Sequence, residues 1–91
     1  MTSSQIWKTL FNEWPAGIHR RGIVVNTLNE AMPFKSFLIK NDTLLLERTN
    51  PDSLNARYIL LAFDSISSVK FVDPLKESVL NAAGFVGKLA P

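Results

Sequence analysis

Residues 57–72, RYILLAFDSISSVKFV, decide the fold of this chain. They hold its densest run of β-branched and aromatic residues, interrupted once by the polar pair Asp64-Ser65. This pattern predicts a strand, a tight corner and a second strand. Residues 58–63 are apolar at every position, which is typical of a strand with both faces covered, or with one face covered by a partner chain. Residues 68–71 alternate between polar and apolar, so the second strand has one face in water.

Three further strands are expected before this pair, at residues 22–28, 34–40 and 43–48, where β-branched, aromatic and leucine residues are concentrated. Residues 29–33 and the pair Asn41-Asp42 provide the turns between them, because proline lacks a donor for a sheet and Asn and Asp favour turns. The polar passage TNPDSLN, residues 49–55, is the longest expected loop. The predicted fold class is therefore all-β.

A short helix is expected at each end of the chain. In the first, apolar residues recur at helical spacing, Thr2 and Gln5 match a capping box, and Pro15 provides the stop. The second begins at Pro74, and two glycines weaken its second half by roughly 1 kcal/mol each. We expect one domain, residues 1–91, with a helix at 3–14, a β-barrel at 21–73 and a helix at 74–89.

Composition places few limits on function. Of the 91 residues, 46% are hydrophobic and 20% are charged, as in ordinary folded domains. A formal charge of +2 permits a nucleic-acid partner without requiring one. The absence of cysteine excludes disulfides and cysteine-based metal sites. The N-terminus lacks the pattern of an export signal, and no apolar run approaches the ~20 residues that cross a bilayer, so we expect a soluble, cytoplasmic protein with no membrane partner.

The order of these elements, a helix and then five strands with one longer loop, resembles the Sm-like (LSm) family over residues 7–73. Four residues keep the spacing of the family's first motif, with a serine where the glycine would stand: Phe34, Ser36, Leu38 and Asp42. Ile66-Ser67-Ser68-Val69 is similar to the Ile-Ser-Thr-Val of the bacterial RNA-chaperone branch. The resemblance implies a small five-stranded, strongly bent antiparallel barrel, Sm-like or SH3-like in architecture. It also implies assembly into a homo-oligomeric ring of roughly five to seven subunits.

The residues with which family members bind uridines are largely replaced in this sequence. Leu45 and Leu46 stand where an Asn is usual, and Ala62-Phe63-Asp64-Ser65 replaces an Arg-Gly or Lys-His corner. Asp64 also brings a negative charge to the place where phosphate would approach. Two functions therefore remain open: an oligomeric RNA-binding module, and a protein-interaction or structural homo-oligomer that has lost the RNA site.

The two functions make different demands on the side chains. RNA binding needs cations for phosphates and aromatic rings for bases. The residues predicted for it are the basic side chains His19, Arg20, Arg21, Lys35 and Arg57, together with Asp42 of the family's first motif. In the competing interpretation, the strand lysines and arginines face solvent and oppose edge-to-edge aggregation. Self-association needs an edge strand and apolar surface, and the residues predicted for it are Tyr58, Leu60, Phe63, Val69 and Phe71.

No group of side chains predicts catalysis. His19 is the one histidine, and the aspartates fall at turns, where Asp is favoured for local hydrogen bonds. The four glycines form no phosphate-binding motif. We therefore expect no enzyme activity, no cofactor, no metal and no small-molecule substrate.

Overall fold

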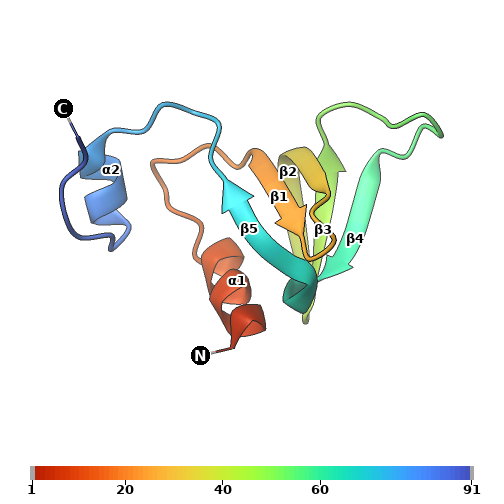
Figure 1. The fold of residues 1–91 in the computed structure, drawn as a ribbon, viewed down its shortest axis with the longest axis horizontal. Helices are drawn as coiled ribbons and strands as arrows, with labels where there is room; N and C mark the ends of the chain where they lie inside the picture. Colours follow the sequence, from red (N-terminus) through yellow and green to blue (C-terminus); the bar gives the residue numbers. More distant parts are fainter. Residues whose placement is uncertain (1, 91) are drawn as a thin grey trace.

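A computed structural model describes residues 2–90 and shows a mainly β protein with a helix before and after the sheet (Figure 1). In chain order the elements are α1 (Ser3–Asn12), β1 (Gly22–Asn26), β2 (Ala31–Lys40), β3 (Thr43–Arg48), β4 (Tyr58–Ala62), the 3₁₀ turn η1 (Phe63–Ser65), β5 (Ile66–Lys70) and α2 (Glu77–Ala82). The five strands form one antiparallel sheet, so the mainly β architecture expected from the sequence is confirmed.

The sheet has the order β4-β3-β2-β1-β5, so two strands that follow each other in the chain lie at its opposite edges. The corner η1 connects them, and in Figure 1 the arrow of β4 points down while that of β5 points up. β2 has ten residues, and its register with β3 shifts between Phe34 and Ser36. Such irregularities let a strand bend. No β4–β5 ladder closes the sheet into a hydrogen-bonded barrel within residues 2–90.

An asparagine with positive φ lies in each of three connections between strands. Asn29, Asn41 and Asn55 have φ of 62°, 53° and 63°. Asn tolerates this left-handed conformation better than most residues because its side chain bonds to the nearby backbone. The turn at Asn41-Asp42 is confirmed as the two-residue link between β2 and β3, since Lys40 pairs with Thr43.

The first turn is shorter than the expected residues 29–33, because β2 already begins at Ala31 and includes Pro33. The Pro33 carbonyl oxygen accepts a hydrogen bond from the N–H of Thr49, just past the end of β3. In an antiparallel strand the N–H and C=O of one residue point to the same side. The donor that Pro33 lacks would therefore point beyond the end of β3, and proline is tolerated there without loss of a sheet bond.

The core is built around buried aromatic rings on α1, β2 and η1. The ring of Phe11 packs edge-on against that of Phe37, with centroids 4.9 Å apart, and lies 6.1 Å from those of Phe34 and Phe63. Aliphatic side chains of the sheet pack around these rings: Val24, Met32, Leu44, Leu46 and Ile66. The capping box expected at Thr2 and Gln5 is present, but α1 ends at Asn12, two residues earlier than expected.

Residues 71–90 form a C-terminal arm, in which α2 is much shorter than the helix expected at 74–89. Gly84 and Gly87, with φ of 105° and 122°, take left-handed conformations that end a helix. Contacts near its start and at α2 attach the arm to the rest of the chain. The rings of Phe71 and Trp14 lie 5.6 Å apart, Arg21 forms an ion pair with Asp73, and Val79 packs against Gly17.

Candidate functional site

The face of the sheet that points away from the core, here called the outer face, carries a row of leucines. Leu38 on β2 pairs with Leu45 on β3, which pairs in turn with Leu60 on β4. Leu38 is 67% exposed and Leu60 is 65% exposed. The side chains directly before and after Leu45, those of Leu44 and Leu46, are fully buried on the core face. Because successive side chains of β3 point to opposite faces, its leucines place apolar surface on both faces of the sheet.

A hollow of about 390 Å³ lies beside this row on the outer face. The Ser36 hydroxyl donates a 2.6 Å hydrogen bond to Oε1 of Glu47 at its wall. The full lining is Arg20, Ser36, Phe37, Leu38, Leu45, Glu47 and Tyr58. The hollow is therefore mixed in character, with apolar side chains next to one guanidinium and one carboxylate.

Both edges of the sheet are open within the described residues. β4 pairs only with β3, and β5 pairs only with β1. The Arg57 carbonyl oxygen accepts a hydrogen bond from the N–H of Arg48, and the N–H of Phe63 donates to the Asp42 carbonyl oxygen. The backbone groups of Arg57 and Phe63 therefore point to the β3 side. Because backbone groups alternate in direction along a strand, those of Tyr58, Leu60 and Ala62 point to the free side. An exposed edge of this kind is a ready template for another strand.

Most of the residues predicted to bind RNA are engaged within the chain. Arg20 stacks on Phe37 and donates to its carbonyl oxygen at 3.0 Å. Arg21 donates to both carboxylate oxygens of Asp73, and this contact raises the pKa of Arg21 and lowers that of Asp73. The carboxylate of Asp42 is occupied by Lys8 Nζ at 2.9 Å. His19 is exposed.

Two of the predicted RNA residues do come together. Lys35 and Arg57 line a small hollow of about 80 Å³ at the base of the β3–β4 loop, with Arg48 as a third cation. Glu47 lies at the same place, and its Oε2 is 4.0 Å from Lys35 Nζ. Arg57 makes no ion pair with any residue from 2 to 90. Arg48 is the last residue of β3, so it lies beside the loop.

The residues predicted for self-association differ in their exposure and fall into three groups. Tyr58 and Leu60 are exposed on the outer face of the β4 edge. Val69 and Phe71 are half-buried, since Val69 packs on the core and Phe71 stacks on Trp14. Phe63 is completely buried, which leaves it no surface for a partner: it fixes the corner from inside the core. Leu38 and Leu45 were missed, and the run of leucines in β3 was the signal that pointed to a second apolar face.

Two other kinds of site are not found in the part of the chain that the structure describes. No three His, Asp or Glu side chains among residues 2–90 are grouped to hold a metal ion. Over the same residues, neither helix is long and apolar enough to cross a membrane. Comparison of the sequence with protein-family models and with curated proteins, and of the chain with solved structures, finds no match.

Proposed function

We propose that this chain is a divergent Sm-like module whose bent sheet forms a barrel and whose main function is to assemble with copies of itself. In this assembly β4 of one copy pairs with β5 of the next, and head-to-tail repetition closes a ring. The partner is thus a second copy of the chain, and the product is a protein scaffold.

One observation carries the proposal: the two free edges are on opposite sides of the same sheet, and the β4 edge is bordered by exposed apolar surface. Pairing of the edges would satisfy the outward backbone groups of Leu60 and cover its side chain at the same time. Edge strands of stable monomers are usually protected by charges, prolines or bulges. From 58 to 62 the sequence of β4 is YILLA, which has none of these.

The test is the molar mass of the protein by light scattering at tens of micromolar, together with two variants of one residue. Leu60→Pro removes a backbone donor that points to the free side, so it blocks edge pairing without removing a β3–β4 hydrogen bond. Leu60→Ala keeps that donor and removes most of the side chain. We expect an oligomer for the unmodified chain, a weakened oligomer for Leu60→Ala and a monomer for Leu60→Pro. A monomer for the unmodified chain at this concentration would refute the proposal.

RNA binding is the second candidate function, supported by the three cations Lys35, Arg48 and Arg57 around one hollow. A phosphate there would be held by charge, so its binding would fall steeply with salt. Titration with a short oligo(U) or oligo(A) near 50 mM salt tests this function. Binding in the micromolar range that is lost in Arg57→Ala would support it, and the absence of micromolar binding would exclude it.

A further inference from the structure

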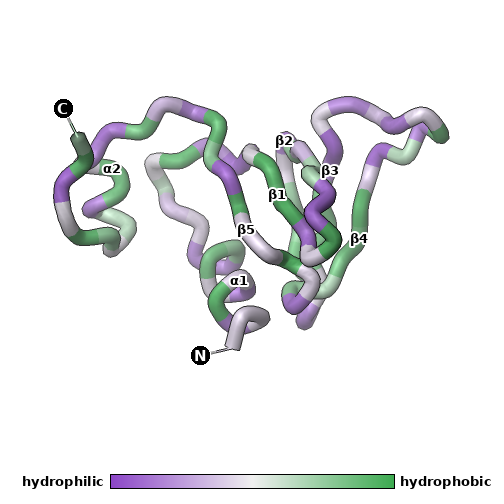
Figure 2. Tube along the Cα trace, in the orientation of Figure 1, coloured by the Kyte–Doolittle hydropathy of each residue, from purple (hydrophilic) through white to green (hydrophobic). Residues whose placement is uncertain are grey.

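The β3–β4 loop, residues 49–57, presents one leucine on a hydrogen-bonded turn. Oδ1 of Asp52 accepts hydrogen bonds from the N–H groups of Leu54 and Ala56, at 2.8 and 2.9 Å. The backbone adds a bond from Asn55 N–H to the Asp52 carbonyl oxygen, at 2.9 Å. The side chain of Leu54 is nevertheless 88% exposed. Figure 2 shows hydrophobic colour at the outer tip of this largely hydrophilic loop.

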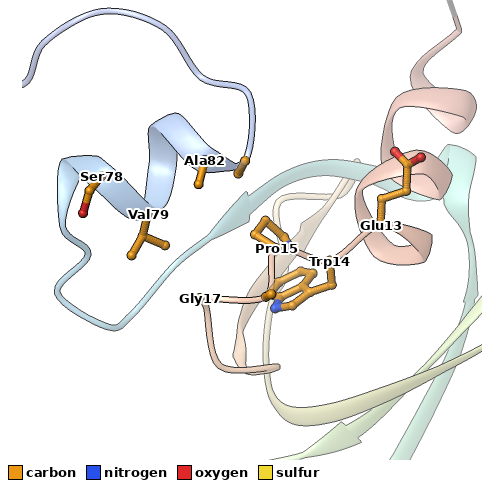
Figure 3. Close-up of a pocket in the computed structure, with 9 residues that line it drawn as sticks. Glu13, Trp14, Pro15, Gly17, Ser78, Val79 and Ala82 are labelled. Carbon is orange, nitrogen blue, oxygen red and sulfur yellow. The ribbon is translucent and has the colours of Figure 1, made fainter.

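A hollow of about 460 Å³ lies on the opposite side of the molecule, between the segment after α1 and the C-terminal arm. Figure 3 shows Val79 and Ala82 of α2 on one side and Trp14, Pro15 and Gly17 on the other. The space is several times the volume of a leucine side chain. Glu13 stands at the rim, and its carboxylate has no hydrogen bond or ion pair with residues 2–90.

Edge pairing would bring the loop of one copy near the arm of the next. When β4 and β5 of adjacent copies pair in antiparallel orientation, the first residue of β4 lies near the last residue of β5. Tyr58 directly follows the loop, and Lys70 directly precedes the arm. Leu54 lies four residues before Tyr58, a chain length that spans at most about 14 Å. In Figure 1 β4 points down and β5 points up. Rotation of a copy about a vertical axis would keep these directions, so β4 of one copy and β5 of the next would meet in antiparallel orientation.

The charges at the two places are complementary. The base of the loop carries three cations, Lys35, Arg48 and Arg57, and one carboxylate, Glu47, so its net charge is positive, while the rim of the hollow carries Glu13. Charges of opposite sign across an interface fix its register and exclude wrong pairings.

We propose that, in the assembly, Leu54 of one copy inserts into the hollow between α2 and residues 13–17 of the next copy, with Arg57 facing Glu13. This inference rests on the proposed function, because it requires β4 and β5 to pair. It gives the β3–β4 loop and the C-terminal arm a function in assembly. Pairing of the strand edges alone would not involve either segment. The interface is then a strand pair with a knob and a hollow beside it.

Since the chain has no cysteine, the contact can be tested by cross-linking single-cysteine variants. Leu54→Cys protein is mixed with Ala82→Cys protein and treated with a short bis-maleimide. We expect cross-linked dimers from this mixture. A mixture of Leu54→Cys with Ser3→Cys, an exposed position at the far end of α1, should give few.

A second measurement separates the charge contact from the knob. Glu13→Arg and Arg57→Glu should each weaken association severalfold, and the two together should restore most of it. Oligomers by light scattering without the Leu54–Ala82 cross-link would overturn this inference and leave the proposed function standing. A monomeric mass for the unmodified chain would overturn both.

Discussion

The guanidinium carbon of Arg20 lies 3.8 Å from the centroid of the Phe37 ring, and the same group donates a 3.0 Å hydrogen bond to the Phe37 carbonyl oxygen. The ring is only 2% exposed, and Phe11 packs against it from the core. Arg20 therefore covers an aromatic residue of the core and belongs to the fold. Its guanidinium is thus already engaged within the chain, by one ring and one carbonyl oxygen.

Replacement of Arg20 by Ala should lower the free energy of unfolding by about 1–2 kcal/mol, through loss of the cation–π contact and of one hydrogen bond. Urea unfolding followed by fluorescence would measure the change. The control is Lys40→Ala, which removes an exposed cation without an ion pair in residues 2–90 and should change stability by less than about 0.5 kcal/mol. Equal effects in the two variants would contradict the structural role given to Arg20.

Asp73 should make the fold sensitive to acid. The hydrogen bond from Arg21 is the main cause that holds the pKa of Asp73 below its ordinary value, so the folded-state pKa lies below that of the unfolded chain, about 3.9. A lowered pKa contributes stability that is complete above the unfolded value and is lost as pH falls through the folded value. In Asp73→Asn we expect a lower Tm than in the unmodified chain at pH 6, and a difference that shrinks as pH falls below about 4.

The control for this pH series is Asp64→Asn, because Asp64 is exposed and its carboxylate accepts no hydrogen bond from residues 2–90. Its Tm should follow that of the unmodified chain throughout. Asp52 contributes in the same direction as Asp73, since backbone N–H groups of Ala56 and Leu54 lower its pKa. A Tm difference between Asp73→Asn and the unmodified chain that stays constant down to pH 2 would show that the ion pair does not titrate as described.

The features that the sequence predicted well are those that depend on neighbours in the chain. The capping box of Thr2 and Gln5 needs residues only three apart, and the turn at Asn41-Asp42 needs only two residues. The placement of Pro33 depended on where another strand ends, which local pattern does not show. The helix at 74–89 was overestimated because apolar spacing outweighed two glycines that adopt positive φ.

The candidate site was harder to predict because its contacts join distant residues. Arg20 and Phe37 are 17 residues apart, and Arg21 and Asp73 are 52 apart. In the sequence these arginines are a basic patch, whereas in the structure each already has a partner. The apolar run at 58–63 also could not distinguish Phe63, which enters the core, from Leu60, which faces solvent.

Gly22 should tolerate no side chain. A Cβ at this position would lie 2.6 Å from the backbone oxygen of Lys70, so Gly22→Ala must push β1 and β5 apart. We expect a loss of stability of about 1–3 kcal/mol, the usual cost of overpacking. Gly17→Ala is the matched comparison, because its Cβ would meet a side-chain methyl of Val79 at 2.8 Å and α2 can shift. Urea unfolding that ranks Gly17→Ala as the more damaging change would contradict this packing.

Substitution of Leu38 tests whether the self-association interface is limited to the strand edge or extends across the outer face. Leu38 lies two strands from the β4 edge, in line with Leu45 and Leu60. If the neighbouring copy covers this row, Leu38→Ser should raise the dissociation constant about tenfold, which corresponds to about 1.4 kcal/mol of lost apolar burial. Leu28→Ser changes a leucine of similar exposure, 77%, in the β1–β2 turn and should leave association unchanged. Because both side chains are exposed, neither variant should alter monomer stability by more than about 0.5 kcal/mol. Sedimentation over a concentration series would measure the dissociation constants, and equal values for the two variants would limit the interface to the edge.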